Sequence, residues 1–241
     1  MAITTKERIL KVLTAYNPWW KTGTTNPSLT KTYKRFAYYE AMNKLQNKDI
    51  RRTVVLTGTR RVGKTTIQYQ MIDALLKQDV SPRQILFVSL DHPMLKLSSF
   101  EDILDCYHEN IYAENDVYYF FDEIQYAQDW DKWLKTIYDM NPETKIVATG
   151  SASPALMKGN SESGAGRWSV ISVPTLSFYE YCEFLFNILF EVEKQINFND
   201  YTTNGKRVLG YLAERVLSVF VWKKEEENSE KEEKFREEEN I

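Results

Sequence analysis

The segment from Gly58 to Thr65 has the residue types that bind phosphate groups. It reads Gly-Thr-Arg-Arg-Val-Gly-Lys-Thr, which fits the pattern G-x-x-x-x-G-K-[ST]. In such a loop the backbone amides surround the phosphates, the Lys64 ammonium reaches the β- and γ-oxygens, and the Thr65 hydroxyl ligates Mg²⁺. The same letters also occur in ordinary glycine-containing turns, so the pattern needs support from a second site.

A pair of carboxylates provides that support. Asp122 and Glu123 directly follow the apolar run Val117–Phe121, which has the length of a buried strand. They could simply be acidic turn residues. In a parallel α/β sheet, however, ligands bind at the carboxyl ends of strands, and both motifs follow a strand. We therefore expect a nucleotide site, with Asp122 holding the metal and Glu123 polarising the attacking water as general base.

Two further residues are candidates for contacts with the transferred phosphate. Ser151 follows the strand-like run Lys145–Thr149, and it either faces the γ-phosphate or caps a helix that begins near Pro154. Arg167 follows the Gly- and Ser-rich loop Gly159–Gly166. It either supplies a cation to the transition state or makes a surface salt bridge.

Cations and aromatic residues near the loop are less informative. Arg60 and Arg61 either raise the positive potential at the phosphates or are simply exposed to solvent. Trp19, Trp20 and Tyr33 have the residue types that stack on adenine, but they serve equally well as anchors of the core.

The surrounding pattern predicts an α/β fold. A β-branched run at Thr53–Thr57 precedes the phosphate loop, and apolar residues at helical spacing follow Lys64 until Ser81. Strands and helices then alternate, which favours a mostly parallel sheet with helices on both faces. The remaining predicted strands are Gln84–Leu90, Val117–Phe121, Lys145–Thr149 and Trp168–Val173.

The termini are predicted to be helical. Helices are expected at Thr5–Tyr16 and Tyr33–Leu45 with a loop from Trp19 to Thr30, and beyond Pro174 at 178–196 and 207–221. We divide the chain into a helical extension (1–50), a phosphate-loop domain (51–175), a helical segment (176–222) and a charged tail (223–241). The tail carries nine Glu against four Lys and one Arg, which predicts disorder or a solvated helix.

Composition restricts the functional class. The chain has 241 residues, 43% of them hydrophobic, with no apolar run of membrane-spanning length and no signal-peptide pattern at Met1–Arg8, so we expect a cytoplasmic protein. Its net charge of −3 gives no general attraction to nucleic acid. Cys106 and Cys182 are far apart and lie beside aromatic residues, which favours core packing over a disulfide or a metal site.

These motifs together resemble one family, the bacterial and archaeal AAA-like P-loop ATPases of unassigned role. The residues that carry the resemblance are Asn17-Pro18-Trp19-Trp20, Leu56-Thr57 with Gly58, Thr59, Arg60, Arg61, Val62, Gly63, Lys64, Thr65 and Thr66, Phe121-Asp122-Glu123-Ile124-Gln125 with Trp130, Thr149-Gly150-Ser151, and Gly166-Arg167 with Leu176–Glu180.

The resemblance covers residues 5 to 185. It implies a P-loop NTPase three-layer sandwich with strand order 5-1-4-3-2, and ATP rather than GTP. No Asn-Lys-x-Asp guanine motif follows the loop, in agreement with ATP. Family members usually continue into a long C-terminal domain. Here only Ser177–Trp222 precedes the tail, so we draw no function from that domain.

The sequence therefore predicts a Mg²⁺-dependent ATPase whose hydrolysis drives a conformational switch towards an unidentified protein partner. Two alternatives remain open: a scaffold that holds nucleotide without turnover, and a small-molecule P-loop kinase. The Asp122-Glu123 pair argues against the kinase because it suits water activation. Binding to nucleic acid rests on family analogy alone.

Overall fold

The computed structural model describes residues 5–151 and 166–195, and the predicted helix at 207–221, the tail at 223–241 and most of the loop before Arg167 lie outside them. The chain divides into two compact units, residues 1–175 and 176–241. The first unit contains the phosphate-loop motif and the acidic pair. The predicted helical extension (1–50) belongs to this same unit.

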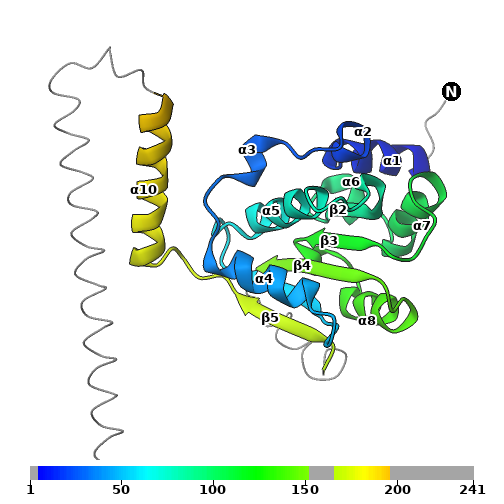
Figure 1. The fold of residues 1–241 in the computed structure, drawn as a ribbon. Helices are drawn as coiled ribbons and strands as arrows, with labels where there is room; N and C mark the ends of the chain where they lie inside the picture. Colours follow the sequence, from blue (N-terminus) through cyan, green and yellow to red (C-terminus); the bar gives the residue numbers. More distant parts are fainter. Residues whose placement is uncertain (1–4, 152–165, 196–241) are drawn as a thin grey trace, which may run out of the picture. The chain divides into compact units, whose positions relative to one another are not determined.

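The first unit is built on a parallel sheet of five strands in the order β2-β3-β4-β1-β5 (Figure 1). This confirms the predicted order 5-1-4-3-2, read from the opposite edge. The strands are β1 (Thr53–Gly58), β2 (Ile85–Ser89), β3 (Tyr118–Asp122), β4 (Lys145–Ser151) and β5 (Trp168–Ser172).

Helices cover both faces of the sheet, as predicted, because alternate strand residues point to opposite sides. Val55 and Phe121 lie in a core shared with α1, α6, α7 and α8, whereas Leu56 and Phe120 lie in a core shared with α4 and α5. The described helices of this unit are α1 (Thr5–Tyr16), α2 (Trp19–Thr22), α3 (Pro27–Thr30), α4 (Phe36–Gln46), α5 (Lys64–Leu76), α6 (Pro93–Lys96), α7 (Phe100–Asn110) and α8 (Trp130–Met140), with 3-10 turns η1 (Pro82–Gln84) and η2 (Ile124–Tyr126).

The segment predicted as a loop from Trp19 to Thr30 contains the short helices α2 and α3, so that prediction was wrong. Gly23 ends α2 in a left-handed conformation with φ 72°. The Asn26 side chain accepts a hydrogen bond from the Ser28 amide at the start of α3, where Pro27 is the first helical residue. These are ordinary helix stop and start signals, but the helices they bound are too short to show a periodic pattern.

The residues Asn17, Trp19 and Trp20 cover the free edge of β2. The Asn17 amide both donates to the Phe87 carbonyl (2.8 Å) and accepts from the Phe87 amide (2.6 Å). Both indole N–H groups donate to the Ile85 carbonyl, at 3.1 and 2.8 Å. An uncovered edge strand exposes unpaired backbone groups, so these side chains have a structural role.

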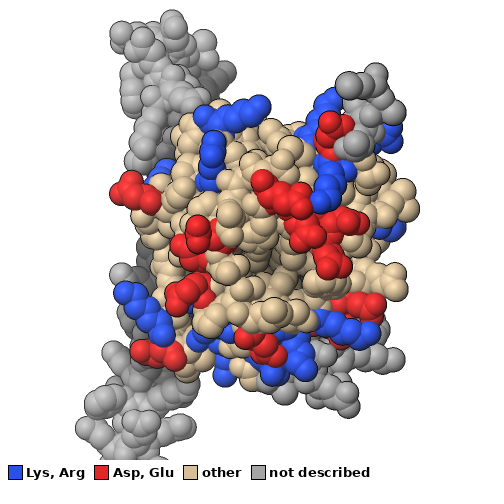
Figure 2. All heavy atoms as spheres, turned by 90° about the vertical axis from the view of Figure 1, so that its right-hand side faces the viewer, with Lys and Arg blue, Asp and Glu red and all other residues tan. Residues whose placement is uncertain are grey.

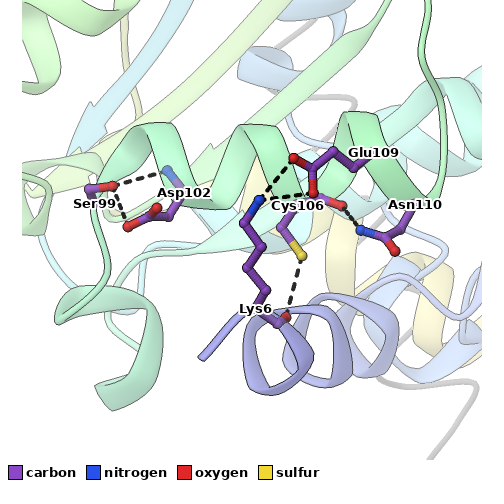
Figure 3. Close-up of polar contacts among 6 residues, drawn as sticks. All are labelled: Lys6, Ser99, Asp102, Cys106, Glu109 and Asn110. Atoms are coloured by element: carbon purple, nitrogen blue, oxygen red, sulfur yellow. Dashed lines mark hydrogen bonds and ion pairs between the residues drawn. The ribbon is translucent and has the colours of Figure 1, made fainter. Parts of the chain in front are cut away.

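Helix α1 packs against α7 through contacts drawn in Figure 3. Lys6 forms an exposed ion pair with Glu109 at 2.8 Å, and the Cys106 thiol donates to the Lys6 carbonyl at 3.5 Å. Ser99 caps α7 by accepting from the Asp102 amide at 3.0 Å. Cys106 is fully buried, which agrees with the predicted role in core packing.

The second unit contributes one described element, α10 (Phe178–Gln195). The Ser177 hydroxyl accepts from the Glu180 amide at 3.1 Å, and the Glu180 carboxylate accepts from the Ser177 amide at 3.1 Å. This reciprocal pair caps the start of α10. In the part of the chain that the structure describes, no helix has the length and apolar composition of a membrane span.

Candidate functional site

The phosphate loop connects the carboxyl end of β1 to the start of α5. Gly63 and Arg61 both have positive φ, 97° and 67°, so the loop turns sharply before the helix begins at Lys64. The Lys64 side chain is buried, and its ammonium donates to the carbonyls of Gly58 (3.0 Å) and Thr59 (2.9 Å). The cation is therefore held within the loop, next to the backbone groups that the motif assigns to phosphates.

At Gly58 the backbone of the phosphate loop lies very close to Val173, the residue after β5. A Cβ atom built on Gly58 would lie 2.3 Å from the Val173 carbonyl oxygen. The segment after β5, residues 173–175, is called the strap below. It is fixed at this point because the Val173 amide donates to the Thr57 carbonyl at 2.7 Å. Only glycine fits this contact without displacing backbone atoms.

Arg35 ties the same loop to the strap after β5. Its guanidinium donates to the carbonyls of Val62 (2.9 Å), Pro174 (2.8 Å) and Thr175 (3.3 Å). The residue lies just before α4 and is 8% exposed. Arg35 thus orders the loop from outside the motif, and no sequence pattern pointed to a role for this residue.

Asp122 lies at the carboxyl end of β3 and faces the start of α5. Its carboxylate accepts hydrogen bonds from the Thr65 hydroxyl, at 3.0 Å to Oδ1 and 3.1 Å to Oδ2. The Thr149 hydroxyl donates to the same Oδ1 at 2.6 Å. The structure therefore brings the two predicted metal ligands, Thr65 and Asp122, into direct contact.

These two residues fit Mg²⁺. The ion prefers oxygen ligands and is usually bound by one or two carboxylates together with substrate phosphates. The Thr65 hydroxyl donates its hydrogen bond to Asp122 and keeps its oxygen lone pairs for a metal. Among the described residues no group of three or more His, Cys, Asp or Glu forms a metal cluster.

Burial raises the pKa of Asp122 from its ordinary value of 3.8 to about 6, although hydrogen bonds from Thr149 and Thr65 oppose the increase. The folded protein therefore binds this proton more tightly than the unfolded chain does. The resulting stability is present below pH 4 and is lost as pH rises through about 6.

We expect the free energy of unfolding of the wild type, relative to that of Asp122→Asn, to fall by about 2 kcal/mol between pH 4 and pH 7 without added metal. Urea unfolding of both proteins at each pH measures this difference. Taking the difference removes the effect of the other carboxylates, because they titrate in both proteins. A difference that stays constant with pH would contradict the raised pKa.

Glu123 follows in a left-handed conformation with φ 52°. Its amide donates to the Thr149 hydroxyl at 3.0 Å, and its carboxylate accepts a short hydrogen bond from the Gln125 side chain. This left-handed residue separates the end of β3 at Asp122 from the start of η2 at Ile124. Backbone strain of this kind is concentrated at functional sites.

Ser151 and the arginines of the loop complete the carboxyl end of the sheet. Ser151 ends β4 and pairs in register with Gly58, so it lies beside the phosphate loop. Its other predicted role, capping a helix near Pro154, concerns residues outside those described. Arg60 and Arg61 are exposed, and Arg60 donates to the Tyr126 hydroxyl at 2.8 Å.

Arg167 is not brought to this site within the described chain. It immediately precedes β5, and its carbonyl accepts from the Thr53 amide at the start of β1. Its side chain forms an ion pair with Asp139 at 2.9 Å. Because β1 is six residues long, roughly 16 Å of strand separates this end from Gly58. Of the two roles expected for Arg167, a cation at the transition state and a surface salt bridge, the ion pair with Asp139 corresponds to the salt bridge.

Trp19 and Trp20 also lie away from the loop. Both donate to the carbonyl of Ile85, the first residue of β2. A separate cavity of about 560 Å³ lies beside η2, lined by both polar and apolar residues, among them Leu90, Phe100, Tyr126 and Trp133. Tyr126, which lines the cavity, also accepts the hydrogen bond from Arg60 of the loop.

Comparisons with known proteins add to this geometry. A family model described as an AAA domain matches residues 50–182, which is more than half of the chain. The chain is 32% identical over 202 residues to the uncharacterized protein MJ1637 of Methanocaldococcus jannaschii, covering 80% of this chain and 41% of the relative. An uncharacterized protein of Haemophilus influenzae is 28% identical over 141 residues, covering 57% and 34%. The chain thus spans less than half the length of these curated relatives.

Two solved structures are similar at low sequence identity. Caenorhabditis elegans PCH-2 matches with a TM-score of 0.43 and 16% identity, covering 83% of this chain and 51% of that one. Saccharomyces cerevisiae RIF2 matches with a TM-score of 0.46 and 11% identity, covering 87% and 77%.

Proposed function

The chain belongs to the AAA domain family, and from that premise we propose that it is a Mg²⁺-dependent ATPase. The observation that carries the proposal is the grouping of Lys64, Thr65, Asp122 and Glu123 at the carboxyl ends of two strands of one parallel sheet. The family supports nucleotide binding. The acidic pair is what favours hydrolysis over binding alone.

Each residue has a distinct role in this proposal. Backbone amides from Thr59 to Thr66 orient the phosphates, and the Lys64 ammonium stabilises the charge that develops on their oxygens. Thr65 and Asp122 hold Mg²⁺, which when bound neutralises phosphate charge. Glu123 accepts a proton from the attacking water, and Ser151 lies at the strand tip nearest to Gly58.

Mg·ATP is expected to raise the melting temperature of the wild type by roughly 5 to 11 °C at about 100 times the dissociation constant. Lys64→Ala should lose most of this increase, since it removes the cation that contacts the phosphates. Differential scanning fluorimetry with and without Mg·ATP measures both effects.

Lys11→Ala is the matched control, because Lys11 is exposed on α1. Its melting temperature should rise on addition of Mg·ATP by the same amount as that of the wild type. The absence of any increase in the wild type, or an equal increase in Lys64→Ala, would refute ATP binding by this loop.

We further propose that hydrolysis drives a conformational switch towards a protein partner. Acidic and basic side chains are interspersed on the side of the molecule that carries α1 and α7, without a continuous basic band (Figure 2). Neutralising the phosphates of a nucleic acid requires such a band, so this side does not favour binding to nucleic acid.

The alternative of a scaffold that holds nucleotide without turnover predicts a different result. Nucleotide recovered unhydrolysed after long incubation with the wild type would support it.

A further inference from the structure

Thr149 joins the two acidic residues of the site through a single oxygen atom. It lies in β4, next to the carboxyl end of β3, and its side chain is fully buried. Its hydroxyl donates to Asp122 Oδ1 at 2.6 Å and accepts from the Glu123 amide at 3.0 Å. Both distances are typical of well-formed hydrogen bonds.

The direction of these two bonds is fixed by the chemistry of the hydroxyl. It has one proton, and the Glu123 amide can only donate, so the proton must go to the Asp122 carboxylate. Thr65 donates to the same carboxylate from the start of α5. The orientation of Asp122 is therefore determined by two hydroxyl groups on different elements.

The bond to the Glu123 amide has a second consequence. Glu123 adopts a left-handed backbone conformation that residues other than glycine disfavour, so it persists only where neighbouring groups hold it. Thr149 holds its amide, and Gln125 contacts its carboxylate. The direction in which the Glu123 side chain leaves the strand thus depends on the Thr149 hydroxyl.

Packing alone does not explain a threonine at this position, as comparison with Thr53 shows. Thr53 is also a buried strand residue, 1% exposed, in β1. Its hydroxyl has no hydrogen-bond partner in the structure. A valine could replace Thr53 with no loss of polar contacts, whereas valine at Thr149 would remove two.

We propose that Thr149 is a positioning residue for hydrolysis, which sets the places of the Asp122 carboxylate and the Glu123 side chain relative to each other. The inference rests on the proposed ATPase function and extends it to a residue outside the phosphate loop and the acidic pair. Thr149 acts through its two neighbours and does not itself touch the triphosphate.

The test compares Thr149→Val, Thr149→Ser and Thr53→Val in Mg·ATP hydrolysis. Thr149→Val should lower kcat by about 10- to 100-fold, because small misplacement of catalytic groups has effects of this size, and should change KM by less than about 3-fold. Thr149→Ser keeps the hydroxyl and should restore kcat to within about 3-fold of the wild type. Thr53→Val should match the wild type.

A second measurement is independent of turnover. Amide hydrogen exchange at Glu123, followed by NMR, should accelerate by about 10-fold or more in Thr149→Val and remain slow in Thr149→Ser. Wild-type kcat and unchanged exchange in Thr149→Val would overturn the inference, as would a Thr149→Ser variant as impaired as the valine. Absence of turnover in the wild type would instead reject the proposed hydrolysis, and the positioning role with it.

Discussion

Replacing Glu123 by glutamine is expected to leave ATP binding intact and to lower the rate of hydrolysis by about 10²- to 10⁴-fold. The amide has the shape of the carboxylate and can still accept the hydrogen bond from Gln125. It cannot, however, accept a proton from water, and loss of a general base has effects of this size. Phosphate release measures turnover, and titration with a fluorescent ATP analogue measures binding.

Glu143→Gln is the matched control for this variant. Glu143 is exposed and precedes β4, at the opposite end of that strand from Ser151. It should keep wild-type turnover, because the change in net charge is the same but the site is untouched. Undiminished phosphate release by Glu123→Gln would remove Glu123 from the proposed role while leaving ATP binding by the loop unaffected.

Gly58→Ala is expected to destabilise the protein by about 3 kcal/mol, which lowers its melting temperature by roughly 6 to 12 °C. The new Cβ would lie 2.3 Å from the Val173 carbonyl oxygen, and the atom it meets is backbone, which cannot rotate away. Relief of the contact requires the strap to move, and this movement strains the bond from the Val173 amide to Thr57. Urea unfolding without nucleotide measures the loss.

Gly63→Ala separates the loss of stability caused by steric crowding from the loss caused by an unfavourable backbone conformation. Gly63 has φ 97°, but nothing lies within 4 Å of a Cβ atom built there. Its replacement should therefore cost only about 1 to 2 kcal/mol, from the unfavourable left-handed conformation. Equal losses for both variants would show that close approach to Val173 is not what requires glycine at residue 58.

Most of the sheet could be predicted from the sequence because β1 to β4 are short, largely apolar and buried on both faces. The run Val117–Phe121 shows this pattern, and β3 is observed at Tyr118–Asp122. The contact between Thr65 and Asp122 follows from the same logic, since the carboxyl ends of parallel strands meet along one edge. Strand order itself came from family resemblance, because local patterns carry no information on which strands are neighbours.

Other parts of the site depend on contacts between distant residues. Thr149 has the residue type expected of any buried strand, and only its position beside Asp122 distinguishes it from Thr53. Arg35 lies outside every motif, yet it contacts the loop through its guanidinium. Arg167 follows a loop of suggestive composition, but the register of β5 with β1 places it at the other end of the sheet.

The guanidinium of Arg35 links the phosphate loop to the strap in the first unit. One planar group donates to the Val62 carbonyl of the loop and to the Pro174 and Thr175 carbonyls after β5. A shift of the Val62 peptide must therefore either drag residues 174 and 175 along or break a charge-assisted bond. Since Thr175 is the last residue of the first unit, Arg35 connects the phosphate loop directly to the point where the chain leaves that unit.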